Sequence, residues 1–272
     1  VFDVLMPLQK QTPSLSVIIP TLNGAETLSE FFAALSRQTV SADEILVGDS
    51  SSTDNTVEVC RQAGATVIPI RRSEFDHGGT RTILAQQARG EVLVFFTQDA
   101  ILARRDSLEM LVNALFQDPL IACAYGRQLP DKRATAVASH LRRFNYPDTS
   151  YVKGYDDRET DGFKTIFISN SFAAYRKDIL EGVGYFKNGL IFGEDTCTLG
   201  RLILNGRKVA YAANAAVYHS HNYTLLEDFR RSFDIGVLHG SETWLLDNYG
   251  SAEKIGASYI HSLFRKLLSD KK

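Results

Sequence analysis

Two of the most apolar stretches of the chain end in an acidic residue. The segment "EILVGD" ends at Asp49, and "VLVFFTQD" ends at Gln98 and Asp99. Short runs of β-branched and aromatic residues are typical of strands buried on both faces of a mostly parallel sheet. Open α/β sheets bind ligands at the carboxyl ends of such strands. We therefore expect both carboxylates at one ligand-binding edge, with a turn or helix cap as the alternative role for each Asp.

A second acidic pair, Glu194 and Asp195, precedes the helix-like segment "TCTLGRLILNGRK". A carboxylate placed there can accept a proton from a reacting hydroxyl group. An ordinary aspartate pKa of about 3.9 would leave Asp195 ionised at neutral pH, so no large pKa shift is expected. The alternative is that both acids only favour the dipole of the helix that follows.

Two further segments carry groups that bind ligands. "HGGTR", residues 77–81, combines glycine amides with the Arg81 guanidinium, which suits an anionic or hydroxyl-rich ligand. A glycine turn before a helix, with Arg81 solvated, is the alternative. His219 and His221 end "AAVYHSH", and strand alternation puts both on one face. They either converge on a site or serve as structural histidines.

The composition excludes several classes of protein. The net charge of -2 gives no reason to expect a nucleic-acid partner. Neither G-x-G-x-x-G nor a P-loop pattern occurs. The three cysteines have no paired spacing and are expected to be buried thiols of a cytoplasmic protein. No apolar run reaches 18 residues, so the chain is expected to be soluble or at most peripheral on a membrane.

Strands and helices must alternate to bring these residues together. Apolar runs and helical spacings predict three strand–helix units and a fourth strand through residue 99, which indicates a parallel, doubly wound sheet. A helix, a strand and a variable loop over residues 133–161 follow, then further strands and helices to residue 221. The stripes Leu225, Phe229, Phe233, Val237 and Ile255, Tyr259, Leu263, Leu267 predict two amphipathic helices at the end of the chain.

Five segments, taken in order, resemble the family 2 glycosyltransferases: "SVIIPTLNGAETL", "EILVGDSSSTDNT", "FDHGGTRT", "FFTQDA" and "FGEDTCTLGRLILNGRKV". The match covers nearly all of residues 15–221. The resemblance implies an α/β nucleotide-diphospho-sugar transferase (GT-A) fold, with a mostly parallel central sheet flanked by helices. It also implies transfer of a sugar from a nucleotide to an acceptor hydroxyl with inversion.

The resemblance implies a role for each motif residue. Pro20, Asn23 and Glu26 would surround the nucleoside, and Asp49 would accept the imide N–H of a pyrimidine. Helix-start and turn roles are the alternatives for Glu26 and Asn23. Gly79 and Arg81 would contact the donor.

The family usually carries two acids where this chain has Gln98 and Asp99. Asp99 would hold Mg²⁺ or Mn²⁺ between the phosphates, and one carboxylate is expected to bind the ion more weakly than two. Gln98 would bind ribose or sugar, and His219 would complete the metal shell or contact the diphosphate.

On the acceptor side, the resemblance makes Asp195 the catalytic base and has Glu194 orient it or bind acceptor hydroxyls. Trp244 would stack on the acceptor sugar, with core packing as the alternative.

The glutamine before the aspartate and the "FDHGGTR" segment are similar to the rhamnosyltransferase branch, which predicts a dTDP-L-rhamnose donor. The alternatives are a UDP-hexose or UDP-N-acetylhexosamine transferase, a sugar nucleotidyltransferase, and a non-catalytic sugar-nucleotide-binding protein. In a nucleotidyltransferase, however, the glycine-rich loop should follow the first strand rather than the third. The acceptor would be a saccharide or lipid-linked saccharide of surface polysaccharide synthesis.

The expected organisation is a catalytic domain over residues 13–222, with a nucleotide-binding half (13–100) and an acceptor-binding half (101–222). A C-terminal helical extension (223–272) would follow. Its last helix carries Lys254, Arg265, Lys266, Lys271 and Lys272 beside an apolar stripe. This helix is expected to pack on the catalytic domain or a sister subunit, or to rest on the inner face of the cytoplasmic membrane.

Overall fold

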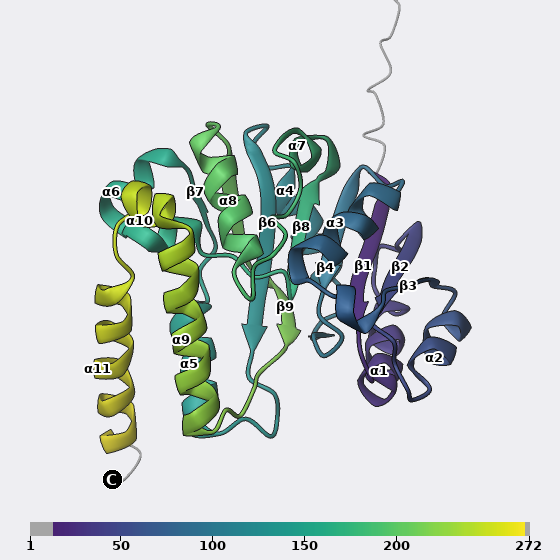
Figure 1. The fold of residues 1–272 in the computed structure, drawn as a ribbon, viewed down its shortest axis with the longest axis horizontal. Helices are drawn as coiled ribbons and strands as arrows, with labels where there is room; N and C mark the ends of the chain where they lie inside the picture. Colours follow the sequence, from purple (N-terminus) through teal and green to yellow (C-terminus); the bar gives the residue numbers. More distant parts are fainter. Residues whose placement is uncertain (1–12, 270–272) are drawn as a thin grey trace, which may run out of the picture.

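The computed structural model describes residues 13–269. Their strands form one nine-stranded sheet in the order β3-β2-β1-β4-β8-β6-β9-β5, with β7 paired to β9 (Figure 1). The strands are β1 (Leu15–Thr21), β2 (Glu44–Asp49), β3 (Thr66–Pro69), β4 (Val92–Phe96), β5 (Ile101–Leu102), β6 (Ile121–Leu129), β7 (Tyr151–Lys153), β8 (Phe172–Arg176) and β9 (Lys208–Tyr218). Lys271 and Lys272 lie outside the described residues, as do residues 1–12.

The first four strands are parallel, as the sequence predicts. Strand β1 pairs with β2 on one side and with β4 on the other, so all their carboxyl ends point the same way. Every residue of β4 is buried, which agrees with its continuous apolar run. Helices α1 (Ala25–Leu35), α2 (Thr56–Gln62) and α3 (His77–Gln87), with the short turn η1 (Arg72–Glu74), connect these strands. Asp49 and the residues after β4 therefore lie at one edge of the sheet.

The second half of the sheet is more mixed than the sequence predicts. Strand β8 lies between β4 and β6 and is antiparallel to both, while β6 and β9 are parallel. Strands β5 and β7 are antiparallel to β9. Alternating strands and helices predict parallel pairing only between strands joined by a crossover, and β4 and β8 are separated by three other strands in the chain. Helices α4 (Ser107–Leu115), α7 (Lys177–Gly182) and α8 (Glu194–Leu204) belong to this half.

Residues 133–161, predicted as a variable loop, contain regular structure. They form α5 (Ala136–Asn145), β7, the turn η2 (Tyr155–Asp157) and α6 (Arg158–Asp161), followed by η3 (Gly162–Ile166). Helix α5 begins at Thr135, whose side chain accepts a hydrogen bond from the amide of Ala138. The prediction was wrong because the buried side of this helix includes the polar residue Arg142, which breaks the apolar periodicity.

Two apolar clusters fill the molecule, one on each face of the sheet. Val17 and Ile19 of β1 belong to one cluster and Ile18 to the other, as alternation along a strand requires. The cysteines Cys60, Cys123 and Cys197 are free and buried in these clusters. This arrangement is a three-layer α/β fold, and the predicted fold class is confirmed.

The chain ends in helices α9 (Leu225–Ser241), α10 (Thr243–Tyr249) and α11 (Glu253–Ser269). In Figure 1, α9 and α11 lie beside α5, at the end of the molecule far from β1–β3. The predicted stripe of α9 is exposed rather than packed: Phe229 is 67% and Phe233 is 64% exposed. The predicted stripe of α11 is half-buried and includes Tyr259, which contacts Phe144 of α5. Within residues 13–269, no helix is both long and apolar enough to cross a bilayer.

Candidate active site

A cleft of about 750 Å³ opens beyond the carboxyl end of β4. Its walls come from loops after β4 and β9, from the start of α8, and from helices α5 and α9. The polar side chains that line it include Arg81, Asp99, Gln128, Arg142, Lys164, Glu194, Asp195, His219, His221 and Arg231. The strand-end aspartate and the acidic pair before α8, which are 95 residues or more apart in sequence, therefore face one cavity.

Asp99, His219 and His221 form a cluster on one side of the cleft. The Nε2 atom of His219 lies 3.4 Å from Oδ1 of Asp99, and Nε2 of His221 lies 3.7 Å from Oδ2. One ligand atom of each residue lies within 4.8 Å of the others. The Asp99 side chain is 34% exposed, so it is only partly buried at its strand end. A carboxylate with two imidazoles fits Mn²⁺ better than a single carboxylate does.

The charges of this cluster also suit a cation. Burial alone would raise the pKa of Asp99, but a hydrogen bond from His219 and the positive charge that His219 and His221 carry when protonated hold it well below its usual range. Burial and the neighbouring His219 lower the pKa of His221 to about 4. Asp99 is therefore anionic and His221 neutral at neutral pH, which are the states that bind metal ions.

Glu194 and Asp195 begin helix α8. The residue before them, Gly193, has a φ of +86°, and a side chain there would lie 2.4 Å from Cδ2 of Leu238 on α9. The Asp195 carboxylate accepts hydrogen bonds from the amides of Asn170, at 3.1 Å, and Thr196, at 2.8 Å. These contacts fix the direction in which Asp195 faces the cleft.

The pKa of Asp195 differs from the expectation. Burial, and next the negative charge of Glu194, raise it to about 7. The prediction of an ordinary aspartate pKa is therefore wrong, because the sequence gives no measure of how deeply the carboxyl group is buried. A carboxylate with a pKa near 7 is a stronger proton acceptor than an ordinary one.

Arg81 is paired with Glu194 rather than solvated. Its Nη1 atom lies 3.1 Å from Oε1 of Glu194, and the side chains are 4% and 7% exposed. Nη1 also donates to the carbonyl of His77 at 3.1 Å. The buried Nε atom of Arg81 has no hydrogen-bond partner within the described residues, and the side chain lines the cleft. The guanidinium thus supports the acidic pair and keeps one donor free.

In "HGGTR", the amide of Gly79 is not free for a ligand. Helix α3 begins at His77, and its cap residue Asp76 accepts a hydrogen bond from the Gly79 amide at 2.5 Å. A side chain at Gly78 would collide with the carbonyl oxygen of Lys187, 1.9 Å away. The expected ligand contact through Gly79 is therefore not supported by the geometry, because its N–H group already caps the helix.

Asp49 is buried at the end of β2 and already has three hydrogen bonds. It accepts from Thr21 Oγ1 at 3.2 Å, from the Ser52 amide at 3.0 Å and from Ser52 Oγ at 2.5 Å. A carboxylate can accept about four hydrogen bonds, so one further donor can be accommodated. Asp49 lies outside the cleft lining, two strands away from β4 in the sheet order.

The other three residues expected around the nucleoside are near Asp49. Asn23 has a φ of 46°, and its side chain accepts a hydrogen bond from the Thr53 amide at 2.8 Å. This contact joins the loop after β1 to the loop after β2. Pro20 is half-buried in β1, and Glu26 is exposed in the first turn of α1. The four residues form a group at the sheet edge, beside the large cleft rather than in it.

Gln98 and Trp244 have roles different from those expected. The Gln98 amide oxygen accepts from the backbone N–H of Leu22 at 2.9 Å, and its NH₂ group donates to the Leu22 carbonyl at 3.1 Å. Each end of this amide is thus engaged once by the backbone of Leu22, which the sequence does not predict. The Trp244 indole N–H donates to Glu242 at 2.9 Å, and its ring packs on Gly200 of α8. Trp244 does not line the cleft within the described residues, so packing in the core is its role.

The sequence analysis did not predict the aromatic wall of the cleft. Aromatic side chains form much of it: Phe144, Tyr146, Tyr151, Phe163, Phe167, Phe192 and Tyr223. Two cations lie among them, Lys164 over the Phe144 ring at 4.6 Å and Arg231 over the Phe192 ring at 4.9 Å. The aromatic enrichment of residues 144–167 was the available signal for this wall.

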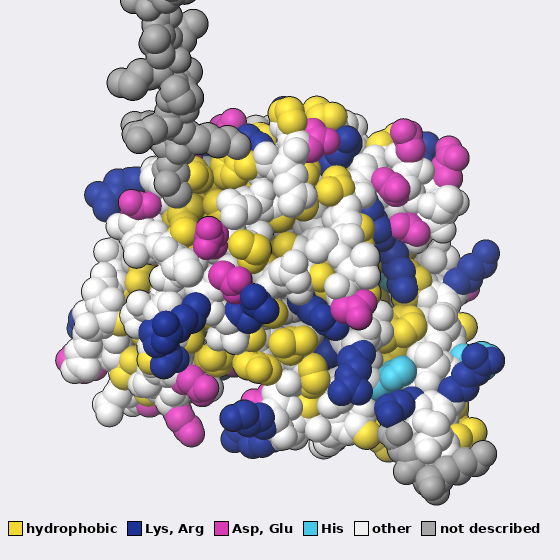
Figure 2. All heavy atoms as spheres, turned by 180° about the vertical axis from the view of Figure 1, so that it is seen from behind, with side chains coloured by type: hydrophobic (Ala, Val, Ile, Leu, Met, Phe, Trp, Pro, Cys, Tyr) yellow, Lys and Arg dark blue, Asp and Glu magenta, His cyan; other side chains and the backbone are white. Residues whose placement is uncertain are grey.

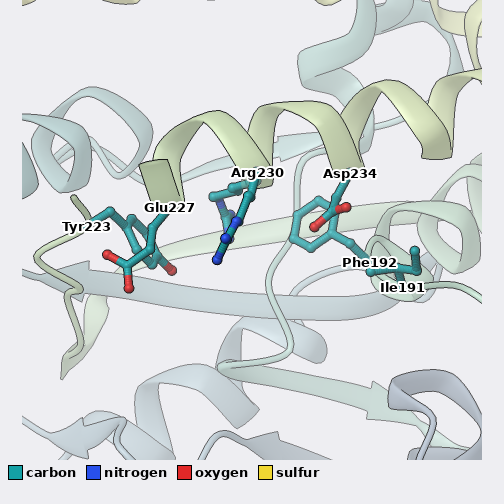
Figure 3. A pocket seen from close by; sticks show the side chains of 7 residues that line it. Ile191, Phe192, Tyr223, Glu227, Arg230 and Asp234 are labelled. Atoms are coloured by element: carbon teal, nitrogen blue, oxygen red, sulfur yellow. The ribbon is translucent and has the colours of Figure 1, made fainter. Parts of the chain in front are cut away.

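A shallower hollow of about 230 Å³ adjoins the cleft along α9. Figure 3 shows its side chains, with Arg230 between Glu227 and Asp234 on the helix and with Phe192 and Ile191 opposite. It shares Phe192, Tyr223 and Arg231 with the large cleft, so it forms the outer rim of that cleft.

Solved structures with the same fold are glycosyltransferases. The mannosyltransferase PcManGT from Pyrobaculum calidifontis, in complex with GDP-Man and Mn²⁺, matches with a TM-score of 0.59 and 18% identity over 92% of this chain and 76% of that chain. TarS 1-349 of S. aureus, in complex with UDP-GlcNAc, matches with a TM-score of 0.62 and 18% identity over 94% of this chain and 73% of that chain. The fold is therefore the GT-A fold of glycosyltransferases.

Sequence comparison gives the family. The model of glycosyl transferase family 2 matches residues 16–184, and the chain belongs to that family. Its curated relatives include the O-antigen chain rhamnosyltransferase WbaN of Salmonella anatum, 40% identical over 95% of this chain and 82% of the relative. RfbN of Salmonella typhimurium, of the same description, is 42% identical over 94% of this chain and 82% of the relative. The protein is a glycosyltransferase, and its resemblance to the rhamnosyltransferase branch is confirmed.

Proposed function

We propose that this protein is an inverting, metal-assisted rhamnosyltransferase of O-antigen synthesis that uses dTDP-L-rhamnose as its donor. The observation that carries the reaction type is the single cleft shared by the Asp99–His219–His221 cluster and the Glu194–Asp195 pair. The identity of 40% and 42% to two O-antigen chain rhamnosyltransferases supports the donor sugar. A UDP-hexose or UDP-N-acetylhexosamine donor is the alternative.

In this proposal, residues 13–100 bind the nucleotide. Asp49 accepts the imide N–H of thymine with its remaining acceptor capacity, and Pro20, Asn23 and Glu26 border the nucleoside. Gln98 holds the backbone at Leu22 in place beneath it. Asp99, His219 and His221 hold a divalent cation, Mg²⁺ or Mn²⁺. Such an ion, when bound, neutralises the negative charge that develops on the departing diphosphate.

Residues 101–222 and helix α9 contribute the acceptor side. Asp195 takes the proton of the attacking hydroxyl group, and Glu194 together with Arg81 holds it in place and sets its basicity. The aromatic wall suits the apolar faces of sugar rings. Lys164 and Arg231, which have no carboxylate within ion-pair distance among residues 13–269, suit a phosphate group. These features support a lipid-linked saccharide diphosphate as the acceptor.

We also propose that α9 and α11 contact the inner face of the cytoplasmic membrane. Their outward sides carry exposed apolar residues: Leu225, Leu226, Phe229, Phe233 and Val237 on α9, and Ile260, Phe264 and Leu268 on α11. Figure 2 shows yellow apolar and dark blue basic side chains side by side at the lower right of the molecule. Apolar burial combined with attraction to anionic lipid favours a membrane surface. A homo-oligomer formed through these helices is the alternative that a membrane assay must distinguish.

A donor panel tests the central proposal. The protein is titrated with dTDP-L-rhamnose, UDP-glucose and UDP-N-acetylglucosamine in the presence of Mn²⁺, and the melting temperature is followed. A ligand that binds only the native state stabilises it, by about 2.7 kcal/mol at a ligand concentration of 100 Kd, and so raises the melting temperature. We expect the largest rise with dTDP-L-rhamnose, followed by release of dTDP when acceptor is added.

Two results would contradict the proposal and favour an alternative. Binding without any donor hydrolysis or transfer indicates a non-catalytic sugar-nucleotide-binding protein. A larger rise with a UDP-sugar indicates the alternative donor. The Asp99→Asn variant should bind the donor more weakly in the presence of metal, while Asp247→Asn, an exposed aspartate on α10, should behave as the wild type.

A further inference from the structure

Behind the proposed metal site, the side chain of Gln128 joins three separate elements. Gln128 lies on β6 and is 2% exposed. Its Oε1 atom contacts Nδ1 of His219 at 2.9 Å and also contacts Nη1 of Arg142 on α5. Its Nε2 atom donates to Oγ of Ser169 at 3.0 Å. Every polar atom of the Gln128 side chain therefore has a partner.

The arginine determines which way the Gln128 amide faces. A guanidinium group only donates hydrogen bonds, so the amide atom beside Nη1 of Arg142 must be the oxygen. The NH₂ group is then directed to Ser169, whose hydroxyl can accept. With Arg142 8% exposed, no bulk water competes for this orientation.

The Gln128 amide in turn determines where the His219 ring carries its hydrogen. An amide oxygen only accepts, so Nδ1 of His219 must be the protonated ring nitrogen. In the neutral ring this leaves a lone pair on Nε2, which lies 3.4 Å from a carboxylate oxygen of Asp99. Two lone pairs at this separation repel each other unless a proton or a metal cation lies between them. The arrangement is therefore suited to a shared cation.

We propose that Gln128, oriented by Arg142, is a positioning residue that holds His219 in the Nδ1–H form and presents its Nε2 lone pair to the cation. The inference rests on the proposed metal site and adds to it the groups that orient one ligand. Removal of such an outer partner typically weakens metal affinity by about 10- to 100-fold.

Metal titration of variants tests the role. Binding of Mn²⁺ alone is measured by electron paramagnetic resonance, and circular dichroism checks that each variant is folded. We expect Gln128→Leu to weaken Mn²⁺ binding about 10- to 100-fold. Gln128→Glu should restore it, because a carboxylate also accepts hydrogen bonds from both Arg142 and Nδ1 of His219.

The His219→Ala variant distinguishes an error in the proposed role of Gln128 from an error in the proposed metal site. If His219→Ala weakens Mn²⁺ binding but Gln128→Leu leaves it unchanged, the positioning role is wrong. If neither variant changes Mn²⁺ binding, the metal site itself is wrong.

A second measurement needs no substitution at Gln128. Long-range proton–nitrogen spectra of ¹⁵N-histidine-labelled protein with Mg²⁺ report which ring nitrogen of each histidine carries hydrogen. The His219 signals are assigned by their loss in His219→Ala. We expect hydrogen on Nδ1 and none on Nε2, and hydrogen on Nε2 would overturn the inference.

Discussion

The guanidinium of Arg81 on α3 lies 3.1 Å from the carboxylate of Glu194 on α8, and both side chains are almost fully buried. This ion pair joins α3, which connects two of the first four strands, to the acidic pair that begins α8. Although Arg81 pairs with Glu194, the negative charge of Glu194 still raises the pKa of the neighbouring Asp195.

Removal of the arginine should cost much stability. Arg81→Met leaves Glu194 buried without its partner, and we expect a loss of about 3–5 kcal/mol in the free energy of unfolding, measured with urea. The matched control is Arg89→Met, because Arg89 pairs with Glu44 but is 84% exposed. There the expected loss is about 1 kcal/mol or less. Equal losses in the two variants would contradict a structural role for the Arg81–Glu194 pair.

Asp195→Asn should separate donor binding from sugar transfer. An asparagine keeps the shape of the side chain but cannot take a proton. We expect calorimetric donor binding close to that of the wild type and a fall in kcat of about 10²- to 10⁴-fold. Asp178→Asn, an exposed aspartate on α7, serves as the control. A turnover of Asp195→Asn equal to that of the wild type would exclude Asp195 as the base.

The pH dependence follows from the raised pKa of Asp195. Because the base must be ionised, kcat/KM should fall as the pH decreases through about 7, the pKa to which burial and Glu194 raise it. Glu194→Gln removes the negative neighbour, so the pKa of Asp195 should fall and the acid limb of the profile should move to lower pH. An unchanged acid limb in Glu194→Gln would assign that limb to another group.

Gln98→Asp would restore the pair of acids usual in the family. Because both ends of the Gln98 amide hold the backbone of Leu22, we expect this variant to bind the donor more weakly. Two lost hydrogen bonds of about 1 kcal/mol each correspond to roughly a 10- to 30-fold loss. Gln86→Asp on the exposed side of α3 is the control for added charge. Tighter donor binding by Gln98→Asp would show that the second acid matters more than the loop contact.

Membrane contact can be tested on the outer side of α9. The double variant Phe229→Ser, Phe233→Ser should lose flotation with vesicles that contain phosphatidylglycerol, and flotation of the wild type should decrease with salt. Leu120→Ser removes another exposed apolar side chain (44%), outside the C-terminal helices, and should float like the wild type. If the wild type does not float but elutes as a dimer that the double variant loses, α9 binds a second copy instead.

Local patterns predicted the part of the site that depends on strand ends. The apolar runs before Asp49 and Asp99 are long enough to define two parallel strands, and their shared edge follows from geometry. The protonation state of Asp195 could not be predicted in this way, because its pKa depends on how deeply the folded chain buries the carboxyl group. Gln98 was assigned to the ligand because no pattern reveals that its amide is bound to Leu22, 76 residues earlier.

The C-terminal helices show a second limit of prediction from the sequence. Periodicity identified the apolar stripe of α9 but could not tell which side faces the protein, and that stripe faces outward. The division at residue 222 stays a prediction. The sequence analysis assigned His219 alone to the metal beside Asp99, and the structure adds His221, whose Nε2 atom lies 3.7 Å from Asp99.

The contact between Leu238 and Gly193 connects helix α9 to the start of α8. One side of the helix offers phenylalanines to the surroundings, and the other places a leucine where a side chain of Gly193 would lie, one residue before Glu194. A helix that is displaced by a contact on its outer side also displaces the residues that its inner side contacts. Because Leu238 fills the space beside Gly193, we expect a movement of α9 toward α8 to displace the turn that carries Glu194 and Asp195, which connects the proposed membrane-facing helix to the proposed base.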